Sequence, residues 1–263
     1  MADDRKKNPN QFIRSTVLPP SNTSSQDEVD AFLARGKKSS SDEVEAFLSN
    51  LNTLSKTHST TTRGRLIFAM DATASREPSW DRACHLQAEM FQEAMSLGGL
   101  EVQLAYYRGY GEFKATPWVS NSQALLAAML KVYCLGGQTQ IERLILQAIK
   151  ETQIKRVQAL VFIGDAFEED IDIVCQVAGQ LGVLGVPAFC FLEGNDPIAT
   201  IGFQQLAKLT NGAYCAFDSG SAGQLKELLK AVAVFAAGGF NELEKYSKIV
   251  KGEALRLSHQ IKK

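Results

Sequence analysis

The sequence has little net charge, few histidines and no closely spaced cysteines. A formal net charge of −1 over 263 residues gives no electrostatic reason to expect binding to nucleic acid or to an anionic membrane. The three histidines stand far apart, and the five cysteines are an odd number without a C-x-x-C pair. A disulfide framework, a structural zinc site and a histidine-rich centre are therefore not favoured, and we expect the cysteines to be reduced core residues.

Long apolar runs are also absent. The most apolar late segment, Ala231 to Phe240, is too short to span a bilayer, and the first residues contain no apolar stretch of the kind found in secretory signals. We therefore expect a soluble, cytoplasmic protein. Apolar residues still make up 45% of the sequence, which is enough to bury a substantial core.

Residues 1–60 differ in composition from the rest of the chain. They are poor in apolar residues and rich in Ser, Thr, Asn, Asp and Lys, a composition that predicts a disordered arm. Within this arm, segment 24–33 recurs with small changes as segment 39–48. Each copy begins with a capping box and then has Val, Phe and Leu at helical spacing. The two copies either pack on the body of the protein or bind a partner as a duplicated peptide.

Residues 61–239 have the pattern of alternating strands and helices. Continuous apolar runs at 66–70 and 160–163 predict strands that are buried on both faces. Further strands are expected at 102–107, 112–119, 187–192 and 213–217, and helices at 80–95, 124–132, 141–154, 170–182, 197–209 and 222–237. This order predicts an α/β domain with a doubly wound, mostly parallel central sheet and helices on both faces. The remaining residues, 240–263, are expected to form a mildly basic, amphipathic helical tail.

Polar residues follow the buried strands. Asp71, Thr73 and Ser75 stand directly after the first strand, Asp165 follows another, and Thr139 lies in a glycine-rich loop before a helix. Because the carboxyl ends of parallel strands meet at one edge of a sheet, these side chains should lie close together. Two carboxylates and three hydroxyls suit Mg²⁺ or Mn²⁺, which prefer oxygen ligands. The neutral hydroxyls would leave the ion incompletely neutralised, so that it could attract an external carboxylate.

This pattern resembles the metal-ion-dependent adhesion site (MIDAS) of von Willebrand factor A (VWA) and integrin I domains. The shared features are D-x-[ST]-x-S after the first strand, a threonine in a Gly-Gly loop and a later aspartate at a strand end. The resemblance covers about residues 63–238 and implies that the five residues named above are the metal ligands. The chain departs from the family at Thr73, where serine is commoner, and at Gly164-Asp165-Ala166, where Thr-Asp-Gly is frequent.

The resemblance implies a non-enzymatic binding and scaffolding module, in which the metal captures an Asp or Glu of a partner protein. Stand-alone intracellular relatives in bacteria often work with ring-forming ATPases or chaperone machines, so an adaptor for such a machine is one expectation. The alternative is a metal-assisted hydrolase or phosphatase, although the phosphate-loop, nucleophile-elbow and dinucleotide motifs are missing. A third interpretation is a metal-free VWA-like protein that binds through other surfaces.

Two further groups of residues have alternative roles. Trp80 either shapes the rim of the metal site or, as we favour, anchors the first helix in the core. Glu168, Glu169 and Asp170 are expected to form a solvated acidic turn that begins a helix. If they lie close to the metal, they would compete with an acidic ligand and could be regulatory.

Overall fold

The computed structural model describes residues 63–218 and 220–261. The predicted arm and its two repeats lie outside these residues. The described strands form one sheet with the order β3-β2-β1-β4-β5-β6. Their bounds are β1 (Gly64–Asp71), β2 (Leu100–Arg108), β3 (Glu112–Ala115), β4 (Ala159–Gly164), β5 (Ala188–Glu193) and β6 (Ala213–Phe217). Within this sheet β3 is antiparallel to β2, and all other neighbours are parallel.

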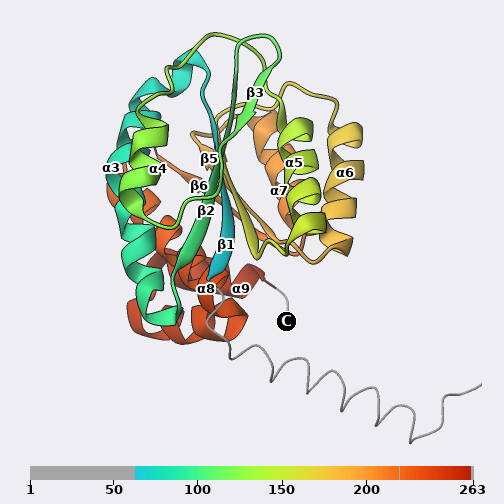
Figure 1. Ribbon diagram of the computed structural model, residues 1–263. Helices are drawn as coiled ribbons and strands as arrows, with labels where there is room; N and C mark the ends of the chain where they lie inside the picture. The colour runs from blue at the N-terminus through green and yellow to red at the C-terminus, as the bar shows by residue number, and fades with distance from the viewer. Residues whose placement is uncertain (1–62, 219, 262–263) are drawn as a thin grey trace, which may run out of the picture. The chain divides into compact units, whose positions relative to one another are not determined.

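Helices cover both faces of the sheet. They are α3 (Glu77–Ala94), α4 (Ser122–Met129), α5 (Ile141–Ile154), α6 (Ile171–Val183), α7 (Pro197–Leu209), α8 (Ala222–Val250) and α9 (Gly252–Gln260), with short 3-10 turns η2 (Ala74–Arg76) and η3 (Met95–Leu97) at the ends of α3. Figure 1 shows α3 and α4 on one side of the sheet, and α5, α6 and α7 on the other. The predicted doubly wound α/β fold is therefore confirmed.

Two hydrophobic cores lie on the two faces of the sheet. Because successive side chains of a strand point to opposite faces, β1 contributes to both cores. Leu66, Phe68 and Met70 pack with residues of α3 and α8, while Ile67 and Ala69 pack with residues of α5, α6 and α7. All eight residues of β1 are buried, as expected for a strand that is covered on both faces.

The core also explains the role of Trp80. Its side chain is only 3% exposed, and its Nε1–H donates a hydrogen bond to the carbonyl oxygen of Met129 at 3.2 Å. The ring contacts Tyr106 edge to face, with centroids 5.9 Å apart. Trp80 therefore anchors α3 against α4 and β2, as the favoured interpretation expected.

The strand predicted at 112–119 is shorter in the structure. Strand β3 ends at Ala115, and beyond it only Val119 pairs with Val102 as an isolated bridge. Pro117 has no N–H group with which to continue the ladder, which accounts for the interruption.

The C-terminal part of the chain also differs from the prediction. The helix expected to end at residue 237 continues as α8 to Val250 through a kink at Gly239, where φ is 74°. The expected single tail helix is instead the second half of α8 followed by α9. Glycine tolerates the positive φ, so the chain can bend there while an apolar face stays against the core. None of the helices within the described ranges is both long and apolar enough to span a bilayer.

Candidate metal centre

The candidate site lies where the strand order of the sheet reverses. The chain runs from β1 to β2 on one side, whereas β4 pairs with β1 on the other side. Asp71 is the last residue of β1, and Asp165 directly follows β4, so both stand at the carboxyl edge of the sheet. Ligand sites of open α/β sheets commonly occur at such a switch point.

The structure brings all five predicted residues together in one cleft of about 270 Å³. Asp71, Thr73 and Ser75 reach it from the end of β1, Thr139 from the loop before α5, and Asp165 from the end of β4. The other lining residues are Ala74, Gly136, Gly137, Ala166 and Glu168. The cleft therefore joins three chain segments that are widely separated in sequence.

Short hydrogen bonds organise the oxygen atoms in the cleft. Asp71 Oδ1 accepts the backbone N–H of Thr73 at 2.6 Å, which closes a local turn after β1. Ser75 Oγ donates to Asp165 Oδ2 at 2.8 Å and lies 3.3 Å from Thr73 Oγ1. One hydroxyl thus bridges the ends of β1 and β4.

The second oxygen of Asp71 has no such partner. Asp71 is 1% exposed, and its Oδ2 makes no hydrogen bond to any described residue. Burial raises the pKa of Asp71 to about 6; the bond from Thr73 opposes this rise, and the charge of Asp165 adds to it. The Tyr107 hydroxyl on β2 is the buried polar group that interacts with Asp71: it makes no hydrogen bond of normal geometry, and after burial the charge of Asp71 is the largest influence that raises the pKa of Tyr107. Buried polar atoms without partners are destabilising, and a cation in the cleft is a partner that Asp71 Oδ2 could accept.

The loop that carries Thr139 is held against the ends of β1 and β2. Leu135 donates its N–H to the carbonyl oxygen of Ala72 at 3.0 Å, and Gln138 donates to that of Gly109 at 3.3 Å. At Gly137 a Cβ atom would lie only 2.1 Å from the Gly109 carbonyl oxygen. Residue 137 must therefore be glycine for the loop to approach β2 this closely.

Glu168 links this loop to the loop after β4. Its Oε2 accepts the backbone N–H of Thr139, and Thr139 Oγ1 accepts the backbone N–H of Glu168, both at 3.0 Å. The two loops that carry Thr139 and Asp165 are thereby joined. Glu168 lines the cleft, so the acidic turn reaches the candidate site.

The next two acidic residues cap helices. The Glu169 carboxylate accepts the backbone N–H groups of Ile141 and Glu142 at the start of α5. Asp170 accepts the N–H of Asp172 at 2.9 Å and caps α6, as expected for the start of that helix. The turn begins a helix, as predicted, but Glu169 is not simply solvated, because it accepts hydrogen bonds from the N–H groups at the start of α5.

A buried ion pair beside the cleft was not anticipated from the sequence. Arg76 in η2 is 1% exposed and pairs with Glu193 at the end of β5, which also accepts the hydroxyl of Ser79. The charge of Arg76 acts to lower the pKa of Asp71, yet burial outweighs it. No motif relates Arg76 to Glu193, because the two are brought together only by the parallel order of the strands.

The residues present fit a Mg²⁺ or Mn²⁺ ion. The donors are two carboxylates and three hydroxyls, which are the hard oxygen ligands that these ions prefer, and Asp71 Oδ2 lacks the partner that a cation would supply. In the part of the chain that the structure describes, no three His, Cys, Asp or Glu side chains are grouped as a metal site. A metal in the cleft would therefore depend on the hydroxyls of Thr73, Ser75 and Thr139.

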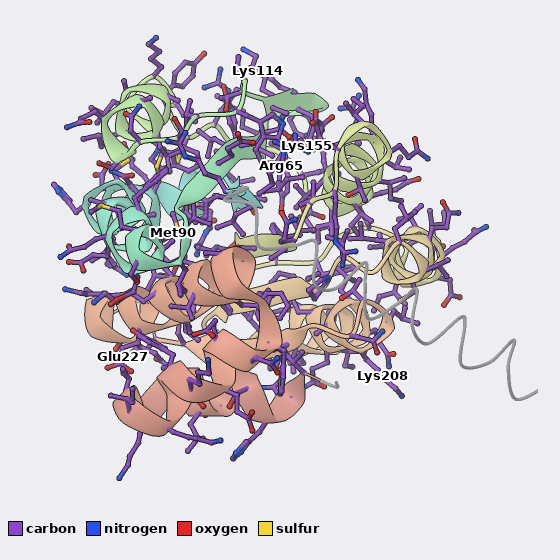
Figure 2. All side chains as sticks on the ribbon, turned by 60° about the horizontal axis from the view of Figure 1, so that its bottom comes forward. Arg65, Met90, Lys114, Lys155, Lys208 and Glu227 are labelled. Atoms are coloured by element: carbon purple, nitrogen blue, oxygen red, sulfur yellow. The ribbon has the colours of Figure 1, made fainter. Side chains whose placement is uncertain are left out.

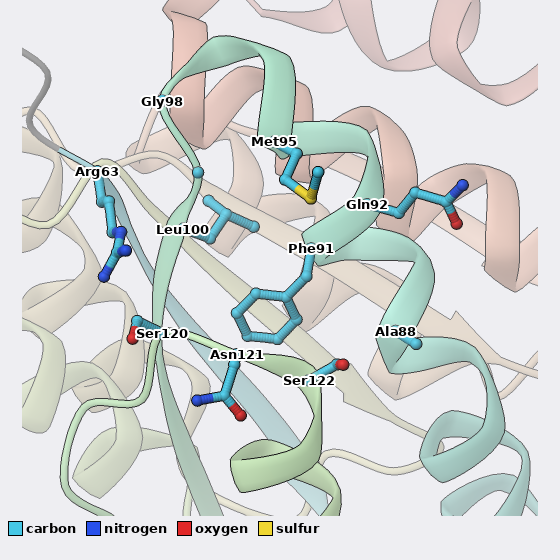
Figure 3. Close-up of a pocket in the computed structure, with 11 residues that line it drawn as sticks. Arg63, Ala88, Phe91, Gln92, Met95, Gly98, Leu100, Ser120, Asn121 and Ser122 are labelled. Carbon is cyan, nitrogen blue, oxygen red and sulfur yellow. The ribbon is translucent and has the colours of Figure 1, made fainter.

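A larger hollow of about 570 Å³ lies elsewhere, at the amino end of β2. Figure 3 shows Phe91, Met95 and Leu100 on one side of it, and Asn121 and Ser122 at the start of α4 on the other. Its lining contains no carboxylate, histidine or cysteine. It offers no grouping of metal-binding or acid–base residues comparable with that in the cleft.

Comparisons with known proteins agree with this fold. No family model matches the sequence, and a comparison with curated proteins finds no significant relative. A von Willebrand factor type A structure from Catenulispora acidiphila is similar with a TM-score of 0.56 and 13% identity, over 67% of this chain and 43% of that chain. The SpRpn10 VWA domain is similar with a TM-score of 0.51 and 12% identity, over 64% of this chain and 97% of that domain. The PilB minor pilin from Streptococcus sanguinis has a TM-score of 0.52 and 8% identity, over 72% and 63% of the two chains. At these identities the likeness concerns the fold, and the chain has a VWA-like fold.

Proposed function

We propose that this domain is a metal-dependent protein-binding module. Mg²⁺ or Mn²⁺ would be held by the five residues of the cleft, which are Asp71, Thr73, Ser75, Thr139 and Asp165. The observation that carries the proposal is the buried Asp71 Oδ2, which has no partner among the described residues. A bound cation would remove the cost of leaving that carboxylate buried and unpaired.

Each residue has a distinct part in this proposal. Asp71 and Asp165 supply negative charge, whereas Thr73, Ser75 and Thr139 supply neutral oxygens that leave part of the ion's charge uncompensated. When bound, the ion supplies a positive coordination position for an Asp or Glu carboxylate of a partner protein. Ser75 is exposed, so a partner can approach the cleft from its side.

The cleft supports binding better than catalysis. Its lining contains no histidine, lysine or cysteine, so a general base would have to come from Asp71, Asp165 or Glu168. Metal-assisted hydrolysis is the alternative. Turnover of a generic phosphate or ester substrate that disappears in Asp71→Ala would favour that alternative over a binding module.

The wider role that we propose is that of a cytoplasmic adaptor for an ATPase or chaperone machine. This part rests on the resemblance of the five-residue pattern to MIDAS-containing domains. The repeated segments 24–33 and 39–48 would provide contacts to a second partner, since two copies of one short motif raise avidity. A metal-dependent pull-down with the full chain, compared with a chain lacking 1–60, separates the two kinds of contact.

A titration of thermal stability with Mg²⁺ and Mn²⁺ tests the metal site. A ligand that binds only the folded state raises stability by mass action, by roughly 2.7 kcal/mol at a concentration 100 times its Kd. We expect a saturable rise in wild type that is lost in Asp71→Ala and Thr139→Ala. The variant Asp81→Asn, which removes an exposed carboxylate outside the cleft, should keep the rise. No rise in folded wild type would contradict the proposed metal mechanism.

A further inference from the structure

Three exposed apolar side chains stand on two segments beside the cleft. Tyr110 is 86% exposed in the turn between β2 and β3, while Tyr133 and Leu135 are 63% and 45% exposed in the loop after α4. The next two residues of that loop, Gly136 and Gly137, line the cleft itself. Tyr110, Tyr133 and Leu135, which we call the rim patch, therefore border the candidate metal centre.

Contacts between the two segments hold the rim patch together. The backbone N–H of Gly109 donates to the carbonyl oxygen of Leu135 at 3.4 Å, and a Cβ atom at Gly109 would lie 3.2 Å from Leu135 Cδ2. The guanidinium of Arg108 lies 3.8 Å from the centroid of the Tyr133 ring and donates to the Tyr133 carbonyl oxygen at 2.8 Å. Two hydrogen bonds of 2.9 Å to Glu112 fix the same guanidinium. The patch is therefore preorganised, and a partner that packs on it would lose little affinity to ordering it.

Basic side chains border the rim patch. Glu112 pairs with both Arg108 and Lys114, so that two positive charges meet one negative charge. Lys131 is exposed earlier in the loop after α4, and Arg143 of α5 donates to a carbonyl oxygen of the β2–β3 turn at 2.6 Å. Neither of these two cations forms an ion pair with a described residue. The five side chains together carry a net positive charge, which attracts acidic groups of a partner.

We propose that the rim patch is the surface that recognises the partner, and that it fits a protein segment in which a bulky apolar side chain stands next to an Asp or Glu. The inference rests on the proposed function, because that Asp or Glu is the residue that the metal ion would capture. The apolar side chain would pack on Tyr133 and Leu135, while the acidic one faces the ion and the basic border. Exposed apolar patches with a polar border, and tyrosine and arginine within them, are typical of protein-binding surfaces.

Panning of a random peptide library, displayed on phage, against the full chain in Mg²⁺ tests the predicted chemistry of the partner. We expect the enriched peptides to share an aromatic or branched aliphatic residue next to an Asp or Glu. A synthetic peptide with the most enriched sequence then serves as the probe, and its affinity is measured by fluorescence anisotropy. A library without enrichment, or enriched peptides that lack this pair of residues, would overturn the inference.

Two variants test the rim patch itself. Tyr133→Ser and Leu135→Ser each remove an exposed apolar side chain, so the fold should persist, which thermal unfolding checks. We expect each variant to weaken probe binding by roughly five-fold or more. Val183→Ser is the matched control, because Val183 is exposed at the end of α6 and does not line the cleft. Its affinity should equal that of wild type, and equal losses in all three variants would overturn the inference.

Lys131→Glu tests the basic border. Reversal of this exposed charge should weaken probe binding by roughly three-fold at low ionic strength, and high salt should reduce the difference from wild type. Lys131→Arg keeps the charge and should bind as wild type does. Unchanged affinity in Lys131→Glu at low ionic strength would contradict the attraction of an acidic partner to this border.

Asp71→Ala and removal of Mg²⁺ separate this inference from the proposed function. If Asp71→Ala abolishes probe binding while Tyr133→Ser and Leu135→Ser bind as wild type does, the inference alone is overturned. If the probe binds equally well without Mg²⁺ and in Asp71→Ala, yet is weakened in the two rim variants, the rim patch remains the recognition surface. In that case the metal-dependent part of the proposed function fails.

Discussion

Each end of strand β1 carries one buried charged residue, and the two residues differ in how fully their side chains are paired. Near the amino end, the guanidinium of Arg65 meets acidic and aromatic partners. At the carboxyl end, Asp71 keeps one oxygen without a partner. Both residues are nearly inaccessible, at 4% and 1% exposure, so the contrast does not arise from a difference in burial.

The amino end is a polar cluster in which ion pairs compensate the charge of Arg65, although its Nε makes no hydrogen bond and lies 3.5 Å from Glu101 Oε2. Arg65 stacks on the ring of Trp118 at 3.8 Å and contacts Glu151 at 3.4 Å, while Trp118 donates its Nε1–H to Glu151 at 2.8 Å. Burial acts to raise the pKa of Glu151, but the bonds from Trp118 and Gln103 and the charge of Arg65 lower it below its usual value. Arg65 also donates to the carbonyl oxygen of Lys155, and Figure 2 shows these two residues near each other at this end.

At the carboxyl end, the effect of burial on the carboxylate outweighs the effects of its hydrogen bond and of the nearby positive charge. Burial is the largest influence on Asp71 and raises its pKa to about 6, despite the bond from Thr73 and the charge of Arg76. The comparison indicates that polar groups at the amino end stabilise the domain, whereas Asp71 lowers its stability in the absence of a ligand. Such a cost is typical of residues retained for binding.

Removal of Glu151 should have the largest effect. Glu151→Ala leaves the buried Arg65 guanidinium with one carboxylate fewer and leaves Trp118 Nε1–H unpaired. We expect a loss of about 3 kcal/mol in the free energy of unfolding, measured with urea. Lys150→Ala, at an exposed position of the same helix, is the control and should change stability little. A loss as small as the control's would show that the amino-end cluster is not stabilising.

Asp71→Asn should raise the stability of the metal-free domain, whereas Glu151→Ala should lower it. The unfolded carboxyl titrates near 3.8 and the folded one near 6, so ionisation disfavours the metal-free folded state as the pH rises between these values. Without metal at pH 7.5, we expect the variant to be more stable than wild type by roughly 2–3 kcal/mol. This advantage should vanish at pH 4, and the variant should not respond to Mg²⁺. Destabilisation at pH 7.5 without metal would contradict the comparison.

Gly137→Ala tests whether the cleft depends on close backbone approach. The added Cβ would collide with the carbonyl group of Gly109, so the loop that carries Thr139 must move away from β2. We expect a loss of about 2 kcal/mol in stability and a weaker response to Mg²⁺. Gly136→Ala is the matched control, since a Cβ atom there would meet no atom within 4 Å. Equal behaviour of the two variants would argue against a closely packed loop.

Trp118→Phe should have the smallest effect of these changes. The phenyl ring can still lie against Arg65, but the hydrogen bond to Glu151 is lost. We expect a loss of about 1 kcal/mol in the free energy of unfolding. A loss as large as that of Glu151→Ala would show that the hydrogen bond from Trp118, rather than the ion pair with Arg65, dominates at the amino end.

Much of the fold could be predicted from local sequence patterns. The helix expected at 141–154 and the strand expected at 213–217 have the observed bounds of α5 and β6. These predictions succeed because the apolar period of a buried helix or strand is a local property. The strand predicted at 112–119 and the single tail helix fail, because Pro117 and Gly239 change the backbone within otherwise suitable patterns.

The five residues of the candidate site could also be named from the sequence, since each stands at a strand end or in a glycine-rich loop. Their assignment as metal ligands stays a prediction. Glu168 was noted as part of an acidic turn, with the alternative that the turn lies close to the metal, but its contacts with Thr139 depend on the approach of two distant loops. No pattern in the sequence indicated that Arg76 and Glu193 would form a buried ion pair.

The sequence by itself determined the alternation of strands and helices, because the apolar period of each element is a local property. That alternation implies a parallel sheet, whose strands end at one edge, and so predicts that Asp71 and Asp165 stand at the same edge. Only the tertiary structure decided how each charge is compensated. Burial and pairing depend on residues that are distant in the chain, and packing of the two cores brought Glu151 to Arg65 while leaving Asp71 Oδ2 without a partner among the described residues.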